Sequence, residues 1–278
     1  MSPSVLPGED AAKRPVAIYF HGVPGAPLEC ARFQPAAREA GVRLVALDRQ
    51  LVGPGLVGEP YFEALADEVA RVADGGPVHL IGFSLGAFVA IRTAIHLKVP
   101  VTGLHLISAA APLEGGNFLG RMAGRAVFET AMRGPIGLNR LTRLQAWMAQ
   151  WAPGLMFQML FAGAAGQDRV LLSDRGFRRE IRDSLRLSLE DGASGYVRDL
   201  TAYVQPWQAR LAEVTTDTAI WHGAADTWVP AEMAVLLKTS IPAASQLNIV
   251  DRLSHYSCLF HALPLILSQI GCPAETPV

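Results

Sequence analysis

The chain has little cysteine, no marked excess of either charge and no long apolar run. Its three cysteines, Cys30, Cys258 and Cys272, stand at irregular spacing that fits neither a disulfide framework nor a zinc site. The formal net charge is −1 over 278 residues, so the whole chain has no overall attraction to nucleic acid or to an anionic membrane. The apolar stretch 104–113 is interrupted by a histidine and a serine, and no run is long enough to span a bilayer.

The first residues, Met-Ser-Pro-Ser, lack the basic and then apolar residues of a secretion signal. We therefore expect a cytoplasmic protein, a monomer or homodimer, that acts on a small molecule without binding nucleic acid or inserting into a membrane. Half of the residues are hydrophobic, so a chain of this length can bury a large core. One α/β domain with an insertion fits that length.

Short apolar runs alternate with helical patterns along most of the chain. Continuous apolar runs are typical of strands buried on both faces, and their alternation with helices predicts right-handed βαβ units on a mostly parallel sheet. The pattern predicts six strands, near residues 16–20, 42–47, 78–82, 103–109, 218–222 and 246–250. Helices are predicted near residues 28–40, 61–73, 85–97, 231–239 and 258–270.

The alternation stops between about residues 113 and 213, where the sequence is helical and is interrupted by glycine or Gly-Pro pairs. The pattern thus predicts a core domain of residues 1–112 and 214–278 with a helical cap, residues 113–213, inserted after the fourth strand. Residues 1–15 have no strand pattern, so no antiparallel hairpin is expected ahead of the first predicted strand.

The sequence Gly82-Phe83-Ser84-Leu85-Gly86 lies between a predicted strand and a predicted helix. Gly-x-Ser-x-Gly in this context is the pattern of a nucleophile elbow, in which the serine occupies a strained turn and the glycines leave room for the backbone. The helix behind the serine presents backbone N–H groups to a developing negative charge. The motif therefore predicts Ser84 as a nucleophile.

A serine hydroxyl needs a base that takes its proton and an acceptor that orients this base. In open parallel sheets such groups gather at the carboxyl ends of strands. Asp226 follows the fifth predicted strand and His255 follows the sixth. The order Ser84, Asp226, His255 is the order expected for this elbow.

Other residues compete for these roles. Glu114 follows the fourth strand and is an alternative acid, but the pattern Gly223-x-x-Asp226 favours Asp226. Asp251 lies too close to His255 in sequence to orient it. For the other six histidines we favour roles in packing or in shaping loops: His21, His79, His96, His105, His222 and His261.

These motifs together resemble the α/β-hydrolase superfamily, in the family's order and over residues 16 to about 270. The matching pieces are His21-Gly22-x-Pro24-Gly25, Asp48-Arg49, the Ser84 elbow, Gly223-x-x-Asp226 and the late His255. The resemblance implies Ser84 as nucleophile, Asp226 as orienting carboxylate and His255 as general base and acid. It also implies an oxyanion hole formed by the backbone N–H groups of Val23 and Leu85.

Gly53-x-Gly55-x-x-Gly58 spells a dinucleotide-binding pattern, which needs its glycines to join strand and helix directly. Here residues 48–52 intervene and Pro54 interrupts the pattern, so no nucleotide is expected. Relatives carry a Gly-x-Gly turn at this place followed by serine, where this chain has Val57.

The cap contains an unusual number of aromatic and methionine side chains in residues 144–162. Part of them packs the cap on the core, and the rest is predicted to line an apolar pocket whose methionines adapt to the ligand. The candidates for substrate contact are His21, Phe83, Trp147, Trp151, Met156, Phe157 and Phe161. The cap is also rich in arginine, and our hypothesis is that one or two of Arg175, Arg178, Arg179 and Arg182 hold an anionic group.

The sequence thus predicts a serine hydrolase that cleaves a carboxylic ester of a small apolar substrate through an acyl-enzyme, without a metal or organic cofactor. The same triad also serves carbon–carbon bond hydrolases, thioesterases and acyltransferases. An alternative of another class is a small-molecule binding protein on the same fold with little turnover.

Overall fold

A single sheet of six parallel strands forms the centre of the protein. The computed structural model describes residues 14–190 and 193–272. The strands are arranged in the order β2-β1-β3-β4-β5-β6, and all five neighbouring pairs are parallel. Their bounds are β1 (Val16–Phe20), β2 (Arg43–Ala46), β3 (Val78–Phe83), β4 (Val101–Ile107), β5 (Thr218–Gly223) and β6 (Ala244–Val250). The predicted six-stranded parallel sheet is confirmed.

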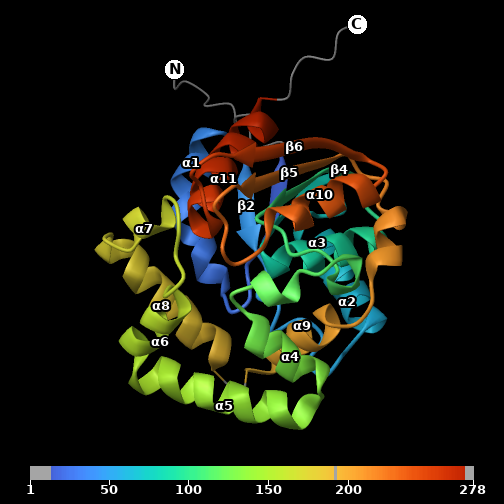
Figure 1. Ribbon diagram of the computed structural model, residues 1–278. Coiled ribbons are helices and arrows are strands. Elements are labelled where there is room, and N and C mark those ends of the chain that lie inside the picture. The colour runs from blue at the N-terminus through green and yellow to red at the C-terminus, as the bar shows by residue number, and fades with distance from the viewer. Residues whose placement is uncertain (1–13, 191–192, 273–278) are drawn as a thin grey trace, which may run out of the picture.

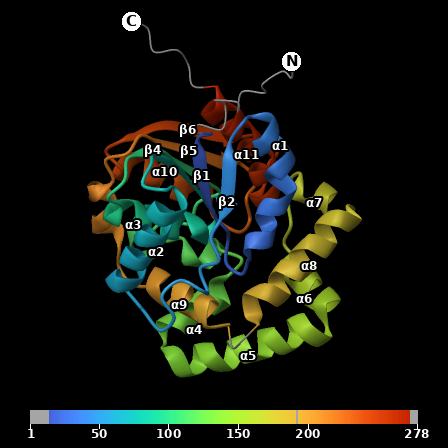
Figure 2. The ribbon, with the colours of Figure 1, turned by 180° about the vertical axis from the view of Figure 1, so that it is seen from behind.

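Helices cover both faces of this sheet (Figures 1 and 2). One face carries α1 (Gln34–Glu39) and α11 (His255–Gly271), while the other carries α2 (Glu59–Val72), α3 (Leu85–His96) and α10 (Ala231–Ser240). Right-handed crossovers explain this division. The connection from β1 to β2 runs in one direction along the sheet, and the later connections run in the other, so α1 lies opposite α2, α3 and α10.

Two predicted helices differ from the observed ones. The pattern at 28–40 forms a 3₁₀ helix at Pro27–Phe33 followed by the short helix α1. Pro35 lacks the N–H that a continuous α-helix needs at this point, so the α-helix begins only at Gln34. The last helix begins at His255 rather than near residue 258. Ser254 precedes it in an extended conformation, and the hydroxyl of Ser257 accepts the backbone N–H of Ser254 at 2.8 Å.

The chain between β4 and β5 folds into a run of helices beyond the carboxyl ends of the strands (Figure 1). We call residues 113–213 the helical segment; its described residues contain no strand. Its helices are α4 (Arg125–Met132), α5 (Pro135–Trp151), α6 (Pro153–Leu160), α7 (Asp168–Leu171), α8 (Arg175–Leu189) and α9 (Ser194–Tyr203), with 3₁₀ turns at Leu113–Gly115, Leu119–Arg121 and Gln208–Glu213.

The predicted lack of a hairpin before Val16 concerns mainly residues 1–13, which lie outside the described residues. Within the described residues, no helix combines the length and the apolar character needed to cross a bilayer. All three cysteines, Cys30, Cys258 and Cys272, are free thiols.

Candidate active site

Ser84 occupies a strained turn between β3 and α3. Its φ is +56° and its ψ is −126°, a conformation that L residues rarely adopt. A Cβ on Gly82 would lie 2.5 Å from Cα of Ala87, and one on Gly86 would lie 2.2 Å from the carbonyl oxygen of Phe20. Both positions therefore need glycine, and the predicted elbow has the geometry that the motif requires.

His255 and Asp226 meet beside this elbow. The Nδ1–H of His255 donates to Oδ2 of Asp226 at 2.8 Å, while Oδ1 of Asp226 accepts the backbone N–H groups of Trp228 and Val229 at 2.8 and 3.0 Å. A second imidazole, His222, places Nε2 3.7 Å from the same Oδ2. Since Nδ1 of His255 faces the carboxylate, Nε2 is the nitrogen left to exchange protons.

The electrostatics of Asp226 favour its ionised form. Burial by itself raises the pKa of this carboxyl, but the neighbouring imidazoles of His255 and His222 and the hydrogen bonds from His255 and Val229 outweigh burial. The pKa of Asp226 is therefore held below its ordinary value. A buried carboxylate in this state keeps the imidazole of His255 in one tautomer and one orientation.

The imidazole of His255 is enclosed by two aromatic rings. Phe83 lies with its ring centroid 4.8 Å away, and Trp228 stacks on the imidazole at 5.2 Å with an interplanar angle of 7°. Only 1% of the His255 side chain is exposed. Sequence reasoning missed Trp228, although an aromatic residue two positions after Asp226, in a loop at the carboxyl end of a strand, was an available signal.

The helical segment holds the start of α11, where His255 lies. Both carboxylate oxygens of the fully buried Asp168 accept backbone N–H groups at this helix N-terminus, from Tyr256 at 3.1 Å and from Ser257 at 2.7 Å. A carboxylate is stabilising there because the first N–H groups of a helix lack intrahelical acceptors. On the core side, the hydroxyl of Ser108 donates to the carbonyl of His255 at 3.1 Å.

The loop that begins at His21 is anchored in a similar way. The guanidinium of Arg49 donates to the carbonyl oxygen of His21 at 2.8 Å and forms a buried ion pair with Asp199 of α9, with Nη2 2.9 Å from Oδ2. The hydroxyl of Ser188 accepts the N–H of Gly25 at 3.2 Å. Burial, and secondarily the charge of Arg49, hold the pKa of His21 well below its ordinary value.

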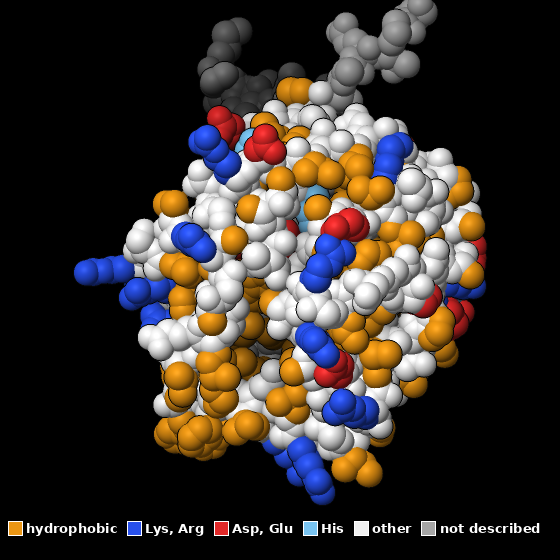
Figure 3. Space-filling model, viewed as in Figure 1, with side chains coloured by type: hydrophobic (Ala, Val, Ile, Leu, Met, Phe, Trp, Pro, Cys, Tyr) orange, Lys and Arg blue, Asp and Glu red, His pale blue; other side chains and the backbone are white. Residues whose placement is uncertain are grey.

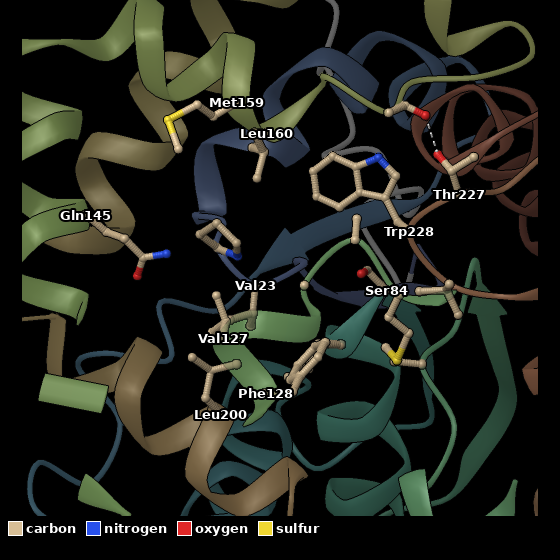
Figure 4. A pocket seen from close by; sticks show the side chains of 18 of the residues that line it. Val23, Ser84, Val127, Phe128, Gln145, Met159, Leu160, Leu200, Thr227 and Trp228 are labelled. Carbon is tan, nitrogen blue, oxygen red and sulfur yellow. Dashed lines mark hydrogen bonds between the residues drawn. The ribbon is translucent and has the colours of Figure 1, made fainter. Parts of the chain in front are cut away.

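A cavity of about 510 Å³ opens above Ser84 (Figure 4). Val23, Leu85 and Trp228 contribute to its floor and sides, and most of the remaining wall comes from the helical segment. The lining side chains are predominantly apolar, as is usual in sites for small organic molecules. The segment's larger apolar contributors are Met122, Val127, Phe128, Met148, Met156, Met159, Leu160 and Leu200.

One polar group lies across the cavity from Ser84. The hydroxyl of Tyr196 donates to Oε1 of Gln145 at 3.1 Å. Figure 4 shows the amide nitrogen of Gln145 pointing toward the middle of the cavity, on the side opposite Ser84. Burial raises the pKa of Tyr196 to about 12, so its hydroxyl remains a donor at neutral pH. Gln145 is a polar lining residue that sequence reasoning missed.

The residues predicted to contact substrate fall into three groups. Met156 lines the cavity. His21, Phe83, Phe157 and Phe161 are buried beside or beneath the cavity without lining it.

Trp147 and Trp151 instead face solvent, with 58% and 73% of their surface exposed. This corrects the expectation that they line the pocket. Their face of α5 lies opposite the buried face, which is formed by Leu138, Thr142 and Ala149.

The remaining candidates lie away from the cavity. Glu114 accepts the backbone N–H groups of Trp207 and Gln208 and thereby caps a 3₁₀ turn. None of the four arginines proposed to hold an anionic group lines the cavity: Arg175, Arg178, Arg179 and Arg182. Among the described residues, no group of three or more His, Cys, Asp or Glu side chains is arranged to hold a metal ion.

Comparisons with known proteins agree with this architecture. Residues 18–264 match the alpha/beta hydrolase family. No curated protein matches the chain. An esterase from Exiguobacterium antarcticum has a TM-score of 0.66 at 16% identity, over 93% of this chain and 92% of that chain. MenH from S. aureus has a TM-score of 0.62 at 16% identity, over 93% and 94%.

A bromoperoxidase from Bacillus anthracis is similar to the same degree, with a TM-score of 0.63 at 17% identity over 91% of this chain and 89% of that chain. At such identities the likeness to solved structures concerns the fold alone. The family match extends over most of the chain, so the protein belongs to the alpha/beta hydrolase family and is a hydrolase enzyme of that family.

Proposed function

We propose that this enzyme hydrolyses carboxylic esters with an apolar acyl part through an acyl-enzyme on Ser84. The observation that carries the proposal is the strained Ser84 at the floor of an apolar cavity, next to a His255 whose Nδ1–H is bound to Asp226 at 2.8 Å. The residues of the helical segment, 113–213, act in this proposal as a cap that shapes the substrate site.

In the proposed reaction, Nε2 of His255 takes the proton of Ser84 as Oγ attacks the ester carbonyl carbon. The protonated His255 then gives this proton to the departing alkoxide, which leaves as an alcohol. A water molecule, deprotonated by the same nitrogen, attacks the acyl-enzyme, and the proton returns to Ser84 as the carboxylic acid departs. Asp226 keeps its charge throughout and stabilises the imidazolium.

The negative charge on the carbonyl oxygen is proposed to be stabilised by the backbone N–H groups of Leu85 and Val23. Leu85 is the first residue of α3, so its N–H has no intrahelical acceptor. Val23 belongs to the loop that Arg49 and Ser188 anchor, and both residues line the cavity beside Ser84. One such donor contributes about 3–4 kcal/mol to lowering the barrier.

A fluorophosphonate probe tests the nucleophile. We expect covalent labelling of the wild-type protein and of the control Ser245→Ala, whose serine is exposed on β6, and no labelling of Ser84→Ala. A folded wild-type protein that stays unlabelled contradicts the proposal and favours a binding protein on the same fold.

A series of p-nitrophenyl esters with acyl chains of increasing length then tests the substrate class. Since the cavity wall is apolar, kcat/KM is expected to rise with chain length until the cavity is filled. Labelling of Ser84 without turnover of any ester in the series points instead to thioester cleavage, carbon–carbon bond hydrolysis or acyl transfer.

A further inference from the structure

Large apolar side chains stand exposed side by side on α5 and α6. On α5, Ile136, Leu144, Trp147 and Trp151 recur at helical spacing and share one face. Leu155 and Met159 continue the surface on α6, which follows after one residue. We call these six residues the α5–α6 surface; their exposed fractions run from 53% for Leu155 to 73% for Trp151.

Single exposed apolar residues are ordinary, but several on neighbouring turns, with two exposed tryptophans among them, mark an interaction site. Figure 3 shows apolar side chains gathered at the lower left, where Figure 1 places α6 and one end of α5. No part of the described chain covers them.

Arginine outnumbers acidic residues in the part of the chain that forms this surface. Residues 117–165 contain five arginines and a single acidic residue, Glu129. Two of these arginines are ion-paired, Arg125 with Glu129 at 2.7 Å and Arg121 with Glu232 at 2.6 Å. Arg140 and Arg143 lie on the exposed face of α5 and form no ion pair within residues 14–190 and 193–272. The α5–α6 surface is therefore locally positive, although the formal net charge of the whole chain is −1.

This charge decides between two possible occupants. A second copy of the chain related by two-fold symmetry would place the same patch against itself, so the unpaired arginines of both copies would meet in an apolar interface. An anionic lipid surface instead accepts tryptophan rings at the headgroup level and pairs arginines with phosphate. The positive charge thus favours a lipid surface.

We propose that the α5–α6 surface docks the enzyme on anionic lipid, without any segment crossing the bilayer. The surface also adjoins the substrate site, since Met159 is 63% exposed and at the same time lines the cavity above Ser84. A docked enzyme would thereby receive apolar esters directly from the lipid phase, a consequence that rests on the proposed ester hydrolysis. The docking on lipid does not depend on the proposed ester hydrolysis.

Sedimentation with lipid vesicles tests the docking. The full-length protein is expected to bind vesicles of phosphatidylcholine mixed with phosphatidylglycerol more tightly than vesicles of phosphatidylcholine alone, and less tightly as salt is raised. Tryptophan fluorescence should shift to shorter wavelength on binding. The variant Trp147→Gln/Trp151→Gln should lose both the binding and the shift. Removing Arg140 and Arg143 together should weaken binding to mixed vesicles by about fivefold for each arginine.

Matched controls separate the docking from folding and from catalysis. Leu265→Gln and Arg38→Gln, on α11 and α1 at the opposite end of the molecule, should bind vesicles like the wild type (Figure 1). Ser84→Ala should bind equally, which keeps a failure of the docking distinct from a failure of the proposed chemistry. The double tryptophan variant should still hydrolyse soluble short-chain esters.

Two outcomes would overturn the proposal. The first is a folded wild-type protein that does not sediment with mixed vesicles at low salt. The second is a concentration-dependent dimer that the double tryptophan variant abolishes, because the α5–α6 surface would then bind a second copy of the chain. Light scattering at several protein concentrations distinguishes these states.

Discussion

The indole of Trp228 lies flat against the imidazole of His255, with the ring centroids 5.2 Å apart and the planes 7° from parallel. One carboxylate fixes both rings, because Oδ2 of Asp226 accepts the Nδ1–H of His255 while Oδ1 accepts the backbone N–H of Trp228. Trp228 also lines the cavity. The stack therefore couples the position of the proposed base to the wall of the substrate site.

Trp228→Ala is expected to lower kcat/KM for esters by about tenfold, since an aromatic pair contributes about 0.5–1.5 kcal/mol beyond its buried area. Trp228→Phe keeps a stacking partner and should recover most of the activity. Steady-state kinetics on one ester measures the difference. Equal losses in both variants would show that the size of the indole matters and the stacking does not.

Asp226→Asn is expected to lower kcat by about 10⁴-fold with little change in stability, because an amide no longer holds the productive tautomer of His255. The control is Asp251→Asn, which replaces an exposed carboxylate close to His255 in sequence and should keep wild-type kcat. If both variants were equally active, Asp226 would have no role in the reaction.

Removing one member of the Arg49–Asp199 ion pair leaves a buried charge without a partner, since both side chains are at most 3% exposed. Asp199→Asn and Arg49→Met should each lower the free energy of unfolding by about 3–5 kcal/mol. The double variant Arg49→Met/Asp199→Leu should be less destabilised than the sum of its single changes. Denaturant unfolding followed by circular dichroism gives these values, and strict additivity would argue against a coupled pair.

Glu29 predicts a pH dependence of stability. Burial raises the pKa of this carboxyl to about 7 against an ordinary value of 4.5, even though the hydroxyl of Ser184 donates to it at 3.0 Å. Between these two values the folded state holds a proton that the unfolded state has released. The free energy of unfolding therefore falls as the pH rises through this window, by up to roughly 3 kcal/mol, and is constant above it.

Glu29→Gln cannot titrate and should therefore remove this dependence of the unfolding free energy on pH. Relative to wild type, the variant should gain stability as the pH rises. Glu39→Gln, an exposed carboxyl on α1, is the control and should keep the slope. Denaturant titrations between about pH 5 and about pH 8 measure it. A wild-type stability that does not change over this range would contradict the raised pKa.

Gln145 predicts a preference for a second polar group on the substrate. Its amide nitrogen faces the cavity opposite Ser84, so it can donate to a carbonyl or ether oxygen remote from the scissile bond (Figure 4). Gln145→Leu should lower kcat/KM about tenfold for an ester with such an oxygen, and much less for the matched alkyl ester. Equal effects on the two esters would assign Gln145 a structural role.

The sequence predicted the fold well because the central strands β1, β3 and β4 are largely buried. Continuous apolar runs such as Val16–Phe20 are typical of strands buried on both faces. His255 follows the edge strand β6, in which polar and apolar residues are mixed. Contacts between distant segments left no local signal, and Arg49 and Asp199 stand 150 positions apart. The aromatic residues of α5 misled us because richness in tryptophan does not tell which helix face is buried.

The contacts of Asp168, Ser188 and Asp199 with the loops of the candidate active site limit how this enzyme can be altered. Each comes from the helical segment, and each satisfies a group of the core: the start of α11, the N–H of Gly25 and the guanidinium of Arg49. A chimera that joins this core to the helical segment of another family member would leave Arg49 buried without a carboxylate. A helical segment grafted onto this core to change its substrate range must therefore contain hydrogen-bond acceptors at these three positions.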